Sequence, residues 1–446
     1  MARAFLTAVF ILGCVIVMPV SASMTQKTMP NGMRILAVED HAQPAVILRV
    51  LLPRGENDDP AGLAGVSDLA AELALKGAGD RDADALAELV DEHGMELVGE
   101  SYAEYTILGC NALSAHFDTA ISILRDVVRA PLLHKKEFDL LKDQAVAGIK
   151  AQRSSPSYLA AISLPPAVFG LDLPQGRVKT EKSVQAIQVE DIRKFHQQCV
   201  QGAGAIALCI GDIDAPAAAE QLEHAFRDIP PGTPPTLPAD IPKNRAPGQV
   251  IEVEKEGLSQ TTVLIGKPGL GRLSAQYYST MVANYVLGAG GFVSRLMAAV
   301  RAKEGKTYGI RSAIASSATP DLFDIKFSTR NEELIPSLKL TMEVMKAYAN
   351  EGPTDTEVAE AKEFYKGYFF LQTETPGQRA AKMLVFLFYG LGLEEMDKYP
   401  GKIDAVTRAS AHAAAREFLT ADGLTYCLVG PKPAIREAGE YLRQKP

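Results

Sequence analysis

A proline-rich segment divides the chain into two stretches of similar length. Seven prolines lie between Pro230 and Pro247, with few apolar residues among them. Proline fixes φ and lacks a backbone N–H, so this composition favours a stiff, extended linker over a helix or strand. We therefore predict an N-terminal domain at residues 23–229, a linker at 230–247 and a C-terminal domain at 248–446.

The two stretches present similar expected elements in a similar order. The matching pairs are 96–99 with 308–314, 105–108 with 322–328, 115–128 with 334–349, and 206–211 with 425–430. An order that repeats in this way indicates two copies of one supersecondary plan. We predict an α+β fold of two homologous domains, each a mostly antiparallel sheet covered by helices.

The N-terminus has the pattern of a signal peptide. Arg3 precedes an apolar run over residues 4–20, and Ser21-Ala22 supplies small residues for cleavage. We predict that residues 1–22 are removed and that the protein is periplasmic or secreted. Cys14 follows Leu12-Gly13 as in a lipoprotein site, but the apolar run continues beyond it, which favours plain cleavage. No later stretch is apolar and long enough for a stable membrane span.

Charge and cysteine spacing exclude two further classes of function. The net charge of −8 argues against a nucleic-acid partner. After cleavage four cysteines remain, none in a CxxC pair, so a zinc cluster is not indicated. We expect Cys209 and Cys427, which lie in apolar strand-like runs, to be packed thiols.

The stretch from Leu287 to Ser312 carries the strongest indication of function. It reads as a glycine loop, a short helix that Ser294 caps and Gly305 ends, and then a strand from Thr307. Arg301 would lie in the last helical turn and Tyr308 at the start of the strand. Both side chains donate hydrogen bonds, so together they could hold a carbonyl oxygen as it gains charge.

Spacing alone leaves a structural alternative open for this pair. Arg301 in a last helical turn also complements the helix dipole. Tyr308 would share one face of the strand with Ile310 and Ser312, where it could simply pack.

The same stretch resembles the second-half signature of the pitrilysin/insulinase family of zinc metallopeptidases, especially its mitochondrial processing peptidase branch. There a glycine loop precedes Ser-Arg-Leu, and an Arg and a Tyr follow seven residues apart. The resemblance implies that Arg301 and Tyr308 bind the substrate backbone and stabilise the tetrahedral intermediate. Gly290, Gly291 and Ser294 are the neighbouring substrate-binding candidates, although the loop is short for this branch and favours a close-approach turn.

The metal motif of the family is degenerate in this chain. Active members carry HxxEH, two zinc-binding His one turn apart and a Glu as base, on a helix that here reads Asp68-Leu69-Ala70-Ala71-Glu72. Asp68 and Glu72 replace the histidines and Ala71 replaces the base. The third ligand, a Glu, has no counterpart near residues 147–150. We predict no zinc or other cofactor in this chain, since two carboxylates alone bind even a hard cation weakly.

Among two-subunit members of the family, the metal can lie on one chain and the substrate-binding groups on the other. The resemblance therefore implies a non-metal, substrate-binding subunit of an exported heterodimeric zinc endopeptidase that acts on peptides. Zinc is expected on an HxxEH-bearing paralogous partner. Two alternatives remain: a non-catalytic scaffold or assembly subunit, and a peptide-binding protein of the same fold.

Overall fold

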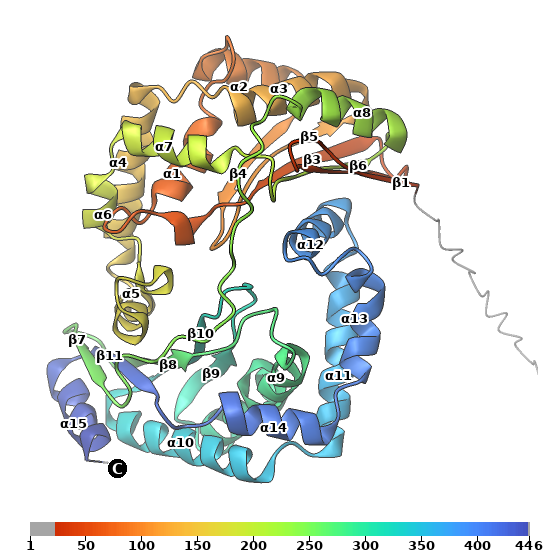
Figure 1. The fold of residues 1–446 in the computed structure, drawn as a ribbon. Coiled ribbons are helices and arrows are strands. Elements are labelled where there is room, and N and C mark those ends of the chain that lie inside the picture. Colours follow the sequence, from red (N-terminus) through yellow and green to blue (C-terminus); the bar gives the residue numbers. More distant parts are fainter. Residues whose placement is uncertain (1–22, 445–446) are drawn as a thin grey trace, which may run out of the picture.

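The computed structural model describes residues 23–444, so the expected signal peptide and Cys14 lie outside the described residues. Two β-sheets face each other, and most helices cover their outer sides (Figure 1). This arrangement confirms the predicted α+β fold of two sheet-and-helix units.

The N-terminal sheet has six strands in the order β1-β2-β6-β3-β5-β4. Only β2 and β6 run parallel among its neighbouring pairs. The strands are β1 (Met24–Thr28), β2 (Arg34–Glu39), β3 (Ala45–Leu52), β4 (Glu96–Ser101), β5 (Thr106–Leu113) and β6 (Ile206–Gly211).

The C-terminal sheet has five strands in the order β7-β11-β8-β10-β9. Only β7 and β11 run parallel. The strands are β7 (Val250–Glu254), β8 (Gln260–Pro268), β9 (Thr307–Ala313), β10 (Leu322–Arg330) and β11 (Thr425–Gly430). This order and these directions repeat β2-β6-β3-β5-β4, so the internal repeat predicted from the sequence is confirmed.

The outer helices are amphipathic and bury one face against their sheet. In α3, Ile121, Leu124 and Val128 are buried at helical spacing. The outer helices of the N-terminal unit are α1 (Val66–Ala74), α2 (Ala83–Glu92), α3 (Phe117–Arg129), α4 (Lys135–Gln152), α6 (Glu181–Ala186), α7 (Val189–Cys199) and α8 (Ala215–Phe226). In the C-terminal unit they are α9 (Tyr277–Asn284), α10 (Leu334–Glu351), α11 (Asp355–Leu371), α13 (Glu395–Asp404), α14 (Arg408–Phe418) and α15 (Lys432–Arg443).

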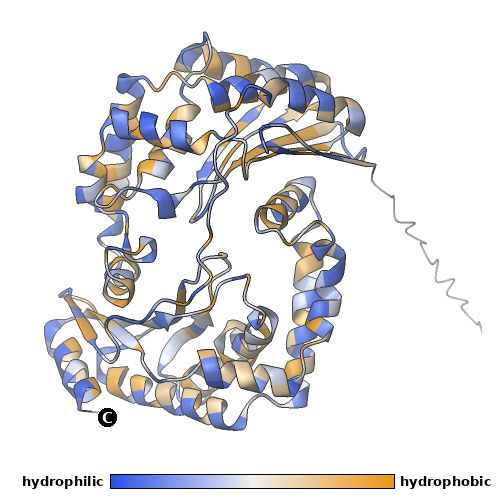
Figure 2. Ribbon diagram, in the orientation of Figure 1, coloured by the Kyte–Doolittle hydropathy of each residue, from blue (hydrophilic) through white to orange (hydrophobic). Residues whose placement is uncertain are grey.

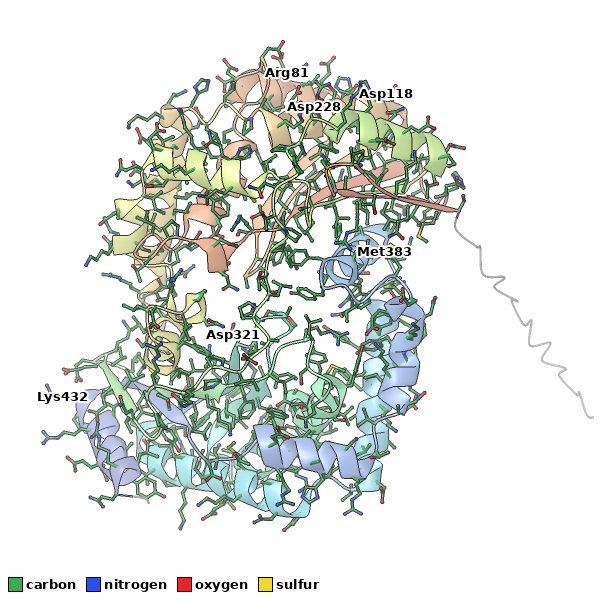
Figure 3. All side chains as sticks on the ribbon, in the orientation of Figure 1. Arg81, Asp118, Asp228, Asp321, Met383 and Lys432 are labelled. Carbon is green, nitrogen blue, oxygen red and sulfur yellow. The ribbon has the colours of Figure 1, made fainter. Side chains whose placement is uncertain are left out.

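Two helices cross between the units and cover the inner faces of the sheets. Helix α5 (Pro156–Phe169) packs on β8 and β11, where Leu164 and Phe169 share a buried cluster with Leu264. Helix α12 (Pro376–Phe388) packs on β3 and β6 of the N-terminal sheet. Leu384 is buried there, and Met383 of the same helix packs against this cluster (Figure 3). Apolar residues mark both α12 and the strands above it in Figure 2.

Residues 230–247 form neither helix nor strand. The Arg245 N–H donates to the Val168 carbonyl at 2.9 Å, and its guanidinium pairs with Asp172 at 2.5 Å. The segment is therefore held to the end of α5. Helix α5 precedes this segment but packs on the C-terminal sheet, and α12 follows it but packs on the N-terminal sheet. Each packed unit therefore contains one helix from the other half of the chain, an arrangement that we call the exchange of α5 and α12.

All four cysteines of the described chain are buried and unpaired. Cys209 and Cys427 are therefore packed thiols, as expected. Among residues 23–444, no helix combines the length and the apolarity needed to cross a membrane.

Candidate functional site

Three short helical segments follow α9 and build the glycine-rich stretch. They are η4 (Tyr285–Ala289), a π-helical turn, η5 (Gly291–Val293), a 3-10 turn, and η6 (Met297–Lys303), a π-helix. The predicted short helix is present, although it is wound as a π-helix, a form that recurs at functional sites. Gly305 ends it with φ +60° and donates to the Arg301 carbonyl at 2.9 Å.

The glycine loop is a tight turn held by hydrogen bonds within it. A Cβ at Gly290 would lie 2.8 Å from the Tyr285 carbonyl oxygen, and Gly291 has φ +61°. Ser294 is fully buried; its hydroxyl donates to the Gly291 carbonyl at 2.8 Å and accepts from the Met297 N–H at 3.4 Å. Ser294 therefore caps the helical segment that begins at Arg295 and continues as η6, and the three residues shape the loop through backbone geometry.

A β-bulge aims Tyr308 away from the sheet core. The pairing of β9 with β10 shifts register, so that Ile310 opposes Phe327 but Thr307 opposes Thr329. The extra residue interrupts the alternation of the strand. Ile310 and Ser312 are buried as predicted, but Tyr308 is 89% exposed. The expectation that Tyr308 shares their face was wrong, because the bulge reverses its direction.

Arg301, Tyr308 and Phe292 form one cluster at the surface, in which the two rings are exposed and Arg301 is half-buried. We call it the Arg–Tyr cluster. The Arg301 guanidinium carbon lies 4.5 Å from the Phe292 ring centroid and 5.4 Å from the Tyr308 ring centroid. Within residues 23–444 neither the guanidinium nor the phenol makes a hydrogen bond or ion pair. Their donors therefore remain available to a ligand, and packing does not account for the position of Tyr308.

The residues of the degenerate metal motif lie on α1, as the register predicts. Lys179 forms an ion pair with Asp68. Asp68 and Glu72 line a surface pocket of about 320 Å³ with Glu100 and Tyr102. The lysine ammonium therefore already neutralises the carboxylate that stands where the first zinc-binding histidine would be.

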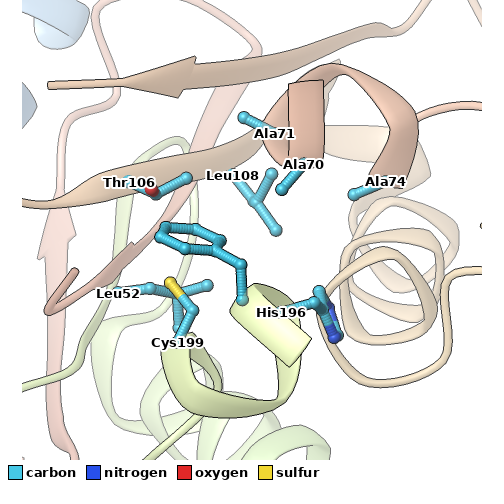
Figure 4. Close-up of a pocket in the computed structure, with 9 residues that line it drawn as sticks. Leu52, Ala70, Ala71, Ala74, Thr106, Leu108, His196 and Cys199 are labelled. Carbon is cyan, nitrogen blue, oxygen red and sulfur yellow. The ribbon is translucent and has the colours of Figure 1, made fainter. Parts of the chain in front are cut away.

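The position of the general base is buried and apolar. Ala71 is 2% exposed and lines a void of about 10 Å³ with His196 and Cys199 (Figure 4). Burial lowers the pKa of His196 to about 4 and raises the pKa of Cys199 to about 12. His196 is therefore only a weak proton acceptor and Cys199 stays a thiol near neutral pH, so neither matches the lost Glu as a general base.

The residues present do not fit a zinc ion. Helix α4 packs against α1 but offers Ala147, Gly148, Ile149 and Lys150 where a third ligand is required. Over the described part of the chain, no group of three or more His, Cys, Asp or Glu residues could hold a metal ion.

Two family models match successive parts of the chain. "Insulinase (Peptidase family M16)" matches residues 34–172 and "Peptidase M16 inactive domain" matches residues 186–365. The chain belongs to peptidase family M16. Within this family it is a homologue without the metal-binding signature, which agrees with the geometry of α1.

Relatives with similar sequences span nearly the whole M16 chain. An uncharacterized zinc protease of Streptomyces coelicolor is 25% identical over 89% of this chain and 87% of its own length. Non-peptidase homolog YmxG of Helicobacter pylori is 23% identical over 95% of this chain and 97% of its own.

Solved structures establish the same fold. A peptidase M16 inactive domain from Pseudomonas fluorescens has a TM-score of 0.84 at 24% identity, covering 92% of this chain and 98% of that one. A protease from Helicobacter pylori has a TM-score of 0.80 at 17% identity, covering 92% of this chain and 100% of that one.

Sequence reasoning missed two members of the site. Phe292 follows Gly291, but its stacking on Arg301 depends on the turn geometry. Lys179 lies 111 residues from Asp68 in sequence, and no local pattern links the two. The sequence offered only a bulky aromatic residue, Phe292, beside a glycine and an isolated lysine, Lys179, as indications of these contacts.

Proposed function

We propose that this M16 chain is the non-metal, substrate-binding subunit of an exported heterodimeric zinc endopeptidase. The Arg–Tyr cluster carries the proposal, because both of its donors are unpaired and Tyr308 is exposed, whereas Lys179 occupies the carboxylate of Asp68 in the metal motif. An M16 chain with an intact HxxEH would be the partner and would hold the zinc.

The chain's own contribution would be two hydrogen-bond donors. The Tyr308 hydroxyl would donate to the scissile carbonyl oxygen as negative charge develops on it. Arg301 would donate to a neighbouring backbone carbonyl, while Phe292 restricts the orientation of the guanidinium by stacking. The partner's zinc would polarise the carbonyl and activate water.

The sheet edges support binding of an extended peptide. β4 and β9 are the last strands of their sheets, so each leaves one backbone edge without a strand partner in the described residues. Peptides commonly add to such edges as an extra strand. β9 also carries Tyr308, which brings the donor close to a peptide on that edge.

Reconstitution tests the proposal. The mature chain alone should bind no zinc and cleave no peptide. Mixed with an HxxEH-bearing M16 chain from the same organism, it should form a complex whose cleavage rate exceeds that of the partner alone by at least about tenfold. Zinc content, gel filtration and hydrolysis of an unstructured peptide are the measurements.

Two outcomes would contradict the proposal. A partner that is fully active alone would show that the Arg–Tyr cluster is not required. A stable complex in which Arg301→Ala leaves the cleavage rate unchanged would instead favour the scaffold role.

A further inference from the structure

The two units enclose a cavity of about 650 Å³ that lies apart from the Arg–Tyr cluster. Its lining residues come from the turn between β4 and β5, the end of β9, and helices α9, α11, α12 and α13. Figure 1 shows where these elements lie. Neither Arg301 nor Tyr308 lines it. A volume of this size matches pockets that bind small molecules or a few residues of a peptide.

Aromatic side chains make up most of the apolar wall of this cavity. They include Tyr105, Tyr277, Tyr365, Phe369, Tyr389 and Tyr399. Phe369 stacks on Tyr399 with ring centroids 4.1 Å apart. A wall of aromatic rings is rigid and presents ring faces and edges, so it suits a planar or branched apolar group.

The one carboxylate in the cavity wall, Glu104, is already satisfied. It is 4% exposed and accepts hydrogen bonds from the Ala318 N–H at 3.1 Å, the Thr319 N–H and the Tyr389 hydroxyl at 2.5 Å. Glu104 therefore has its own neutralising donors and does not pair with a cation of the wall.

Arg272 is buried in the wall and shares its counter-ion with a second cation. Its guanidinium pairs with Glu395 at 3.2 Å and lies 4.4 Å from the Tyr277 ring centroid. Glu395 also pairs with Lys402. One carboxylate thus neutralises only one of two positive charges, which leaves this part of the cavity wall with a net positive charge.

Lys382 of α12 is the cation without a counter-ion. It lines the cavity and is only partly exposed, and within the described residues it makes no hydrogen bond or ion pair. Burial and then the nearby Arg272 lower the pKa of Lys382. An ammonium held in this way is stabilised when an anion joins it.

We propose that this cavity binds a carboxylate joined to an aromatic body, with the carboxylate at Lys382 and the ring among the tyrosines. The ligand could be a free aromatic acid or the C-terminus of a peptide, since both present the same chemistry. The inference does not rest on a metal-bearing partner, so binding can be measured on this chain alone.

Fluorescence of a tryptophan probe tests this site directly, because the chain contains no Trp. N-acetyltryptophan should bind with a blue-shifted emission, and N-acetyltryptophanamide should bind at least about tenfold more weakly because a charged hydrogen bond is lost. A tetrapeptide ending in Trp and its amide form the second pair. Tighter binding of the tetrapeptide than of the free acid identifies a peptide C-terminus; equal binding identifies a free acid.

Matched variants separate the site from general effects. Lys382→Met should abolish the preference for acid over amide, whereas Lys398→Met, at a 61% exposed side chain, should preserve it. Equal melting temperatures would show that both variants fold. Equal binding of acid and amide, no binding of either pair, or an unchanged preference in Lys382→Met would overturn the proposal.

Discussion

At the scale of single residues, position within the backbone decides which side chains are available. Tyr308 is exposed because the bulge in β9 reverses its direction, and Arg301 lies in the last turn of η6 before Gly305. The Arg301 guanidinium lies against the rings of both Phe292 and Tyr308. A strand without the bulge would place the phenol beside Ile310 in the core, with no donor facing outward.

His196 makes stability depend on pH. Its pKa is about 4 in the folded chain, against an ordinary value of 6.5. Between these values the unfolded chain takes up a proton that the folded chain does not, so stability falls as pH decreases from about 6.5 to about 4. The loss amounts to about 3 kcal/mol.

His196→Leu should remove this dependence. Urea unfolding at pH 7 and pH 4.5 would measure it, with His224→Leu, at an exposed position, as the control. If the free energy of unfolding of His196→Leu falls between the two pH values as much as that of the wild type, the assignment to this imidazole is wrong.

Local patterns predicted the caps but not the direction of Tyr308. Ser294 caps the helical segment that continues as η6 and Gly305 follows its end, as expected, because capping depends on neighbouring backbone groups. The bulge depends on the register with β10, which the sequence of β9 does not contain. The Lys179 ion pair with Asp68 is likewise a tertiary contact.

At the scale of elements, the exchange of α5 and α12 ties the units together. Leu164 of α5 and Leu384 of α12 are fully buried, each against the sheet of the opposite unit. Hydrophobic periodicity shows that a helix has an apolar face but does not say which sheet that face covers. The repeated succession of elements, by contrast, predicted two similar sheets, although it did not give their strand order.

Leu164→Ala and Leu384→Ala should each destabilise the whole chain by about 3 kcal/mol, since each removes a buried side chain. Because each helix joins both units, thermal unfolding should remain one transition that shifts to lower temperature. Leu140→Ala, at a 53% exposed position, should have little effect. Two separate transitions in either core variant would show that the units unfold independently.

At the scale of the whole molecule, the two units should remain associated without a continuous linker. A protease site inserted after Asp240, in the segment without helix or strand, would be cut without breaking the α5 and α12 contacts. The two fragments should then co-elute in gel filtration. Separate elution under native conditions would contradict the role of the exchanged helices.

We propose above all that Tyr308 donates a hydrogen bond to a peptide held at the zinc of a partner chain. The turnover number of the reconstituted pair with Tyr308→Phe tests it most directly, with Tyr368→Phe, also at an exposed tyrosine, as the control. We predict a loss of about 100-fold in kcat for Tyr308→Phe, because one donor to the developing oxyanion is removed. An unchanged melting temperature and a fully active Tyr368→Phe pair should accompany it. A Tyr308→Phe pair that cleaves peptide at the wild-type rate would contradict the account.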